Sequence, residues 1–316
     1  MLPAMKKKVL LFLITAVSLF ATSANGAPMA YSVNSDGQNT KTWDSLYLID
    51  LANSGSEQRR GALFSGAYNH FDTEGLAFSP DGTLWGVDDE SAILFPINTT
   101  TAAINFLDVI PLPTFSLGGG DDFGMTFACD STLYVTSVAS RTLYRVDKQG
   151  KSTAVGSIGA LGANISAIAA IGNPAMLYGL GLGNVDSPVL YSIDTQTGVA
   201  TAIGPLVNAA PYNEGGLAFD ADGNLWAITD RSGLGNQPSQ VLSINVDTGL
   251  ATVASTTIET GFESLAIAPP THCEGRVDAG DDDDYPPIPA LGPIGLLLMT
   301  LALMLVGMIF LRRRVS

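Results

Sequence analysis

A block of about fifteen residues that occurs twice constrains the fold of this 316-residue chain more than any other feature. The stretches 74–88 and 215–230 share Gly-Leu-Ala-Phe, an Asp-Gly turn and Leu-Trp, and three weaker copies occur elsewhere. The equivalent positions of the five copies, 49, 43, 49 and 48 residues apart, are Leu76, Met125, Ile168, Leu217 and Leu265. Repeats of this length are typical of solenoids, arrays and propellers.

A second motif of the type Leu-Tyr-x-Ile-Asp recurs five times between these positions, and three copies are followed by a turn and a further strand-like run. Each repeat therefore predicts four short antiparallel strands, with Asp-Gly and Thr-Gly turns between them. The chain begins with three strands of one unit and ends, at 265–267, with the missing first strand. A solenoid would have capped ends instead. The sequence predicts an all-β, five-bladed β-propeller over residues 28–271, closed by its N- and C-terminal strands.

The repeat that contains Leu84-Trp85 and Leu225-Trp226 resembles the units of NHL-like, YncE-like and SMP-30-like propellers. Because many propellers with unrelated functions share this pattern, the resemblance implies the fold and not an activity. We interpret the two tryptophans as residues of the core between blades.

Acidic residues stand just before the first strand of four repeats, where a propeller places them at one mouth of its central channel. These candidate metal ligands are Glu74, Asp121, Asp122, Glu214 and Glu263. The remaining repeat has Asn164 and Ser166 there, and the second strands end at the same face with Asp88, Asp89 and Asp230.

Clustered carboxylates raise one another's proton affinity unless a cation neutralises them, so Ca²⁺ is the first candidate ligand. The similarity to SMP-30-like lactonases implies a divalent metal at this mouth. The alternative is that acids beside glycines form solvated turns in a very acidic protein, and no cofactor is certain.

The net charge is −15, and removing the basic clusters at the two ends leaves nine basic residues against 30 acidic ones. Such a body repels phosphate backbones, which excludes nucleic acid as a partner.

The two ends of the chain predict export and membrane attachment. Residues 1–24 have the basic head, short apolar run and small residues of a signal peptide, which makes signal peptidase a partner. An acidic, proline-containing linker at 272–287 precedes an uncharged run at 294–311, which is just long enough to cross a bilayer as a helix. Arg312, Arg313 and Arg314 follow and place the C-terminus in the cytoplasm.

The segment 288–316 resembles an IPTL-type sorting signal, a relative of the PEP-CTERM signals of Gram-negative bacteria. The motif residues are Ile288, Pro289, Ala290 and Leu291, and Ala290 departs from the usual Thr. The resemblance implies an exosortase-type partner, cleavage near the motif, and transfer to the cell surface or extracellular matrix. The alternative is a plain single-span anchor.

Four other residues could carry chemistry, but their spacing predicts no catalytic triad. His70 and His272 are the only histidines, and we interpret both as surface turn residues. Cys129 and Cys273 belong to units that are not neighbours, so whether they form a disulfide stays open.

Three functions remain. The first is a non-enzymatic surface or matrix protein whose propeller binds another protein or a glycan. The second is a metal-dependent hydrolase or lactonase at the acidic mouth. The third is a scaffold that uses Ca²⁺ only for rigidity.

Overall fold

The computed structural model describes residues 27–37, 39, 44–64, 72–89, 91–112, 122–183 and 188–273. The predicted signal peptide, transmembrane helix, IPTL motif and arginine cluster lie outside these residues, as do Asp121, His70 and all of the linker except His272 and Cys273. No helix of the described part has the length and hydropathy needed to cross a bilayer.

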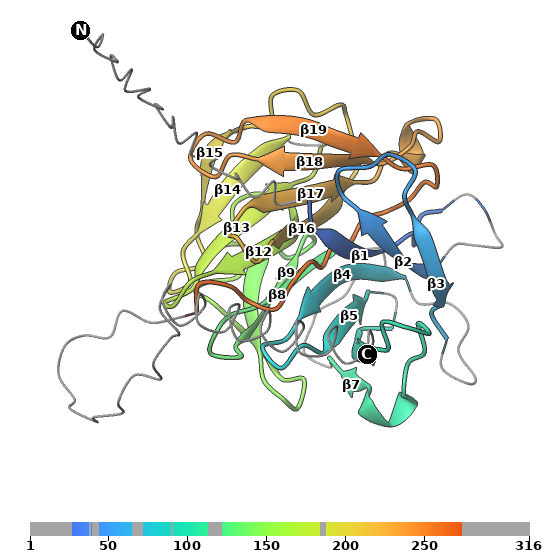
Figure 1. Cartoon of the computed structure of the whole chain (residues 1–316). Helices are drawn as coiled ribbons and strands as arrows, with labels where there is room; N and C mark the ends of the chain where they lie inside the picture. The colour runs from blue at the N-terminus through green and yellow to red at the C-terminus, as the bar shows by residue number, and fades with distance from the viewer. Residues whose placement is uncertain are drawn as a thin grey trace, which may run out of the picture. The chain divides into compact units, whose positions relative to one another are not determined.

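The described residues form five antiparallel sheets, one of three strands and four of four strands (Figure 1). The three-stranded sheet contains β1 (Met29–Val33), β2 (Ser45–Asp50) and β3 (Gln58–Ala62). The next two contain β4 (Thr73–Phe78), β5 (Leu84–Asp88), β6 (Ile93–Ile97) and β7 (Ile110–Pro111), then β8 (Phe123–Phe127), β9 (Leu133–Ser137), β10 (Thr142–Val146) and β11 (Ser152–Ala154). The last two contain β12 (Ile165–Ile171), β13 (Met176–Gly181), β14 (Val189–Ile193) and β15 (Ala200–Pro205), then β16 (Gly215–Phe219), β17 (Leu225–Thr229), β18 (Gln240–Ile244) and β19 (Ala251–Thr256). Short 3₁₀ turns occur at η1 (Phe106–Asp108) and η2 (Ser232–Leu234).

Each sheet is one blade of a propeller, and the first strand of each four-stranded blade is the innermost. The strands β4, β8, β12 and β16 contact one another in this order around the centre (Figure 1). Five clusters of buried apolar side chains each lie between two neighbouring blades of the described chain. The predicted five-bladed propeller is therefore confirmed.

The C-terminal end of the propeller completes the three-stranded blade, as predicted. Tyr31 N donates to Ala266 O at 2.7 Å, and Ala266 N donates to Tyr31 O at 2.9 Å. The Ser264 hydroxyl accepts a hydrogen bond from Val33 N at 3.2 Å. The segment around Ala266 thus serves as the innermost strand and covers an edge of β1 that would otherwise be open to association.

Candidate metal centre at the acidic mouth

The structure brings four of the predicted acids together at one mouth of the central channel. Glu74 is the second residue of β4, Asp122 and Glu214 directly precede β8 and β16, and Glu263 precedes the closing segment. The start of each innermost strand therefore delivers one carboxylate to the channel axis, except in the blade that begins with Asn164.

Glycines next to these acids allow the innermost strands to approach each other closely. A Cβ atom on Gly75 would lie 2.8 Å from Met125 Cγ and 2.9 Å from Phe123 O. A Cβ atom on Gly216 would overlap the backbone of Ser264 and Leu265. The repeated Gly-Leu-Ala-Phe pattern thus narrows the ring at the level of the carboxylates.

Three overlapping groups of carboxylates have one oxygen per residue within 4.8 Å of the others. They are Asp36–Glu214–Glu263, Glu74–Asp122–Glu214 and Asp72–Glu74–Asp89. Because Glu214 and Glu74 each belong to two groups, the three form one continuous cluster, which we call the acidic mouth.

Two members of the acidic mouth, Asp36 and Asp72, were missed in the sequence analysis. Asp36 follows β1, as Asp89 follows β5 and Asp230 follows β17, so its position after a second strand was a usable signal. Asp72 lies four residues before Leu76, as Asp121 lies four residues before Met125, so its position in the repeat was also a usable signal.

Two further acids at this face have their oxygens engaged by turns. Asp88 Oδ1 accepts hydrogen bonds from the backbone and hydroxyl of Ser91, both at 2.7 Å. Asp230 accepts from Ser232 N at 2.9 Å, from the Ser232 hydroxyl at 3.0 Å and from Asn213 Nδ2 at 3.1 Å. Both carboxylates stabilise loops and are poor candidates for ligands.

Other carboxylate oxygens of the acidic mouth are buried with no hydrogen-bond partner. Glu263 is only 2% exposed and its Oε1 has none, and neither does the buried Oε2 of Glu214. The Ser166 hydroxyl, in the blade without an acid, is likewise buried and unpartnered. Burying a polar oxygen without a partner costs about 1–3 kcal/mol, and more for a charged one.

Burial raises the pKa of Glu74, Glu214 and Glu263 well above the usual value, and neighbouring carboxylates raise it further. For Glu263 the strongest of these neighbours is Glu214, and for Glu214 it is Asp122. Burial also raises the pKa of Asp72 to about 7, with Asp89 and Asp36 adding to the effect. These shifts mean that the cluster favours protonation, and a bound cation would relieve the same repulsion.

The donor set suits a hard cation. All three groups consist of carboxylates, with neither His nor Cys, and Ca²⁺ takes six to eight oxygen ligands in flexible geometry. Mg²⁺ requires a stricter octahedron, and Zn²⁺ sites usually include nitrogen or sulfur. Glu214 and Glu263, with their unpartnered oxygens, are the residues that fit the cation best.

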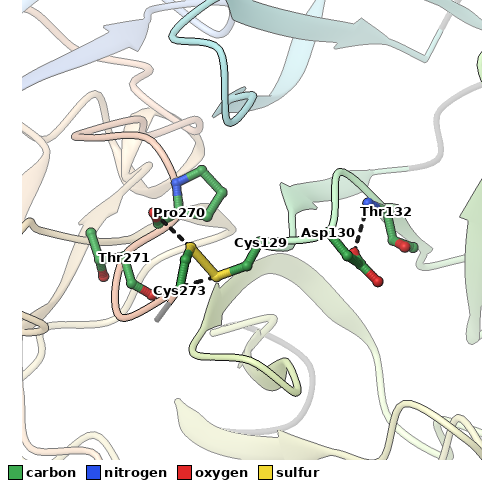
Figure 2. The surroundings of a disulfide bond; sticks show 6 residues. All are labelled: Cys129, Asp130, Thr132, Pro270, Thr271 and Cys273. Carbon is green, nitrogen blue, oxygen red and sulfur yellow. Dashed lines mark hydrogen bonds between the residues drawn. A yellow bond between two sulfur atoms is a disulfide. The ribbon is translucent and has the colours of Figure 1, made fainter. Parts of the chain in front are cut away.

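The cysteines and the remaining histidine lie at the opposite mouth. Cys129, in the turn between β8 and β9, and Cys273 form a disulfide with a Cα–Cα separation of 5.2 Å (Figure 2). The residues 268–271 line a cavity of about 30 Å³ together with all five innermost strands. The segment that follows the closing strand therefore crosses the channel and reaches, through the disulfide, a blade that is not its neighbour. His272 is exposed beside the Gly223 turn, which agrees with its interpretation as a surface residue.

No protein-family model matches the chain, and no curated protein matches it either. Solved structures with a similar fold include a protein of unknown function from Bacteroides caccae, with 8% identity, a TM-score of 0.48 and coverage of 77% of this chain and 99% of that one. Virginiamycin B lyase from Staphylococcus aureus is 17% identical, with a TM-score of 0.41 and coverage of 73% and 70%. The calcium-binding protein regucalcin from Agrobacterium tumefaciens is 19% identical, with a TM-score of 0.40 and coverage of 72% of each chain. At these values the likenesses carry no inference about activity, and the chain is described as a five-bladed β-propeller.

Proposed function

We propose that this chain is an exported bacterial β-propeller that binds a divalent cation, with Ca²⁺ as the first candidate, and acts at the cell envelope as a binding or structural protein. The cation site rests on the environment of Glu263. This residue is almost fully buried, its Oε1 has no hydrogen-bond partner, and it lies in one group with Glu214 and Asp36. A bound cation would compensate the charge that this position concentrates.

The proposed location rests on the predicted signal peptide and C-terminal tail. In this proposal signal peptidase removes residues 1–24, the helix at 294–311 holds the chain in the membrane, and an exosortase-type enzyme processes the tail. The Cys129–Cys273 disulfide supports an oxidising compartment, where such bonds persist.

A binding or structural role is favoured over catalysis by the side chains present. Among the described residues, both cysteines are in the disulfide and the one histidine, His272, is at the opposite mouth. The second candidate is a metal-dependent hydrolase or lactonase at the same mouth. The exposed position of Asp36 favours it, because a cation held there would be open to solvent and could activate water.

The test is the melting temperature of the full exported chain, purified in mild detergent, in EDTA and across a Ca²⁺ titration. A ligand that binds the native state stabilises it by about 2.7 kcal/mol at a hundredfold excess over Kd. We expect a saturating rise that Glu263→Gln and Glu214→Gln each weaken at least tenfold in apparent affinity. Asp247 is exposed in the turn after β18 and belongs to none of the three carboxylate groups. The matched control Asp247→Asn should therefore leave the Ca²⁺-dependent rise in melting temperature unchanged.

The absence of any shift with Ca²⁺, Mg²⁺ and Mn²⁺ would contradict the cation site. If the shift occurs, hydrolysis of lactone and ester substrates by the Ca²⁺-loaded chain decides between the two candidates. Turnover that disappears in Glu263→Gln would favour the hydrolase.

A further inference from the structure

A cleft of about 350 Å³ lies between blade β4–β7 and blade β8–β11, away from the acidic mouth. The outermost strands of these two blades, β7 and β11, have only two and three residues, whereas β15 and β19 have six each. The chain between β6 and β7 turns toward β3, where Ile104 N donates to Phe64 O at 3.2 Å. Among the described residues, the outer part of this gap is thus bordered by the two shortest strands of the propeller.

Two aromatic rings lie in the cleft. In neighbouring blades an aromatic residue of the second strand packs against a phenylalanine at the end of the next innermost strand. The ring centroids are 5.9 Å apart for Tyr31–Phe78 and 5.5 Å for Tyr178–Phe219, but 6.5 Å for Trp85–Phe127. The Trp85 pair thus has the longest centroid separation of the three.

The indole of Trp85 also lacks the partner that its counterpart has. Trp226 Nε1 donates to Asp220 Oδ2 at 2.9 Å. In the blade of Trp85, Ser79 stands in place of Asp220, and its hydroxyl donates to Asp81 Oδ1 at 2.6 Å. Among the described residues the Trp85 N–H has no such acceptor, so it is available as a donor in the cleft.

The rest of the cleft combines an apolar floor with a charged rim of both signs. The floor residues besides the two aromatic rings are Leu94, Ile110, Leu133 and Val146. The rim contains the carboxylates of Asp81 and Asp147 and the ammonium of Lys148. Hydrogen bonds from Ser79 and Thr83 to Oδ1 lower the pKa of Asp81 and keep this carboxylate ionised. Asp147 Oδ1 likewise accepts from Gln149 N and Lys151 N, so Oδ2 of each carboxylate is the acceptor left for a ligand.

We propose that this cleft binds a pyranose ring of a polysaccharide. A sugar ring has an apolar C–H face, whose positively polarised hydrogens are attracted to the negative face of an indole. Its hydroxyls donate to carboxylates and accept from Lys148 and from the Trp85 N–H. The volume of the cleft is in the range of small-ligand sites.

The rim disfavours two other ligand classes. The two carboxylates repel an anion, and a purely apolar ligand would bury the rim charges without partners. An organic cation is the competing ligand, because the net negative rim and the indole attract it, and the test therefore includes one. The inference rests on the proposed binding role at the cell surface, but it does not require the cation site.

The test measures binding of the methyl glycosides of glucose, galactose, mannose and N-acetylglucosamine to the full exported chain. Binding is detected by saturation-transfer NMR and by tryptophan fluorescence. We expect at least one glycoside to bind, and Trp85→Leu to weaken it by about tenfold or more through loss of stacking. Lys148→Ala should weaken binding severalfold. The matched control is Trp226→Phe, which changes the equivalent position of another blade and should leave the affinity unchanged.

Folding and the cation site are checked in the same variants. Glycoside affinities are compared only among variants that melt cooperatively near the wild-type temperature. The melting-temperature response of each variant to Ca²⁺ is recorded separately, so that failure of the cleft is distinguished from failure of the cation site. If Trp85→Leu does not fold, Lys148→Ala decides the question. The proposal is overturned if no glycoside binds the wild type, if tetramethylammonium binds more tightly than every glycoside, or if folded Trp85→Leu and Lys148→Ala bind as well as wild type.

Discussion

The two mouths of the channel are built from the same five innermost strands but are finished in opposite ways. The strand starts converge on Glu74, Asp122, Glu214 and Glu263, and one buried oxygen each of Glu214 and Glu263 lacks a hydrogen-bond partner. The strand ends surround the segment 268–271, which is fixed beyond the channel by the Cys129–Cys273 disulfide (Figures 1 and 2). At one mouth the carboxylates repel one another, and the other mouth is closed by a covalent bond.

This difference indicates which mouth serves stability and which is free for a ligand. Hydrogen bonds at the closed mouth join separate blades: Gly172 N donates to Thr271 O at 3.0 Å, and the Cys129 sulfur also lies near Thr271 O. At the acidic mouth, by contrast, carboxylates of several blades lie together although they repel one another. We therefore expect loss of the closed mouth to cost stability and changes at the acidic mouth to depend on protons and cations.

The largest effect is expected from the double variant Cys129→Ser, Cys273→Ser. The disulfide joins residues 144 apart, and a loop of this order restricts the unfolded chain by about 3–5 kcal/mol. The variant should melt about 10 °C or more below the wild type in calorimetry. A reductant should lower the melting temperature of the wild type and not that of the variant. Equal melting temperatures of the two proteins would show that the closed mouth adds no stability.

The next effect is expected from Gly216→Ala at the acidic mouth. The added Cβ would overlap the backbone of Ser264 and Leu265, which cannot move aside as a flexible side chain can. We expect a loss of about 2–3 kcal/mol, in the range of overpacked cores, measured by chemical denaturation. Gly162→Ala is the control for backbone strain, because Gly162 has a positive φ of 67° but open space around its Cβ position. A similar small loss in both variants would contradict the close approach of the innermost strands.

Much of this architecture was predictable from the repeat. The spacing of Leu76, Met125, Ile168, Leu217 and Leu265 indicates the blades, and the incomplete first and last units indicate the closure. The acids beside the innermost strands were found because a repeat places equivalent residues at equivalent points of a ring. Asp36 and Asp72 also occupy repeated positions, after a second strand and four residues before Leu76, but the sequence alone did not show that these positions reach the same mouth.

The disulfide stayed open in the sequence analysis for a geometric reason. Blade order along the chain suggests that Cys129 and Cys273 are apart, but every turn that follows an innermost strand lies near the common axis. A segment that crosses this axis can therefore reach any blade. The cleft at Trp85 lies beside β7, whose shortness the repeat itself does not encode.

A smaller effect, of a few degrees in melting temperature, is expected from pH in the presence of EDTA. The folded pKa values of Glu74, Glu214 and Glu263 lie above the ordinary 4.5, and that of Asp72 is about 7, so the folded chain binds more protons than the unfolded one above pH 4.5. Stability should therefore fall as pH rises from 5 to 8. Glu263→Gln should reduce this slope, and saturating Ca²⁺ should flatten it, because the cation replaces the protons. A melting temperature that rises with pH in EDTA would contradict the raised pKa values of the carboxyl groups at the acidic mouth.

The smallest effect is expected from Thr271→Val. This variant allows the unpartnered Thr271 hydroxyl at the closed mouth to be compared with the unpartnered carboxylate oxygens at the acidic mouth. The Thr271 hydroxyl is buried with no hydrogen-bond partner in the described structure, and valine has nearly the same shape. Removing the polar atom should stabilise the chain by up to about 1 kcal/mol, measured by chemical denaturation, with no dependence on Ca²⁺ or on pH. Glu263→Gln also removes a charge from a buried unpartnered position, but its effect should change sign when Ca²⁺ is added. If Thr271→Val responded to Ca²⁺ in the same way, the two mouths would be coupled, and the division between a structural end and a ligand-binding end of the channel would fail.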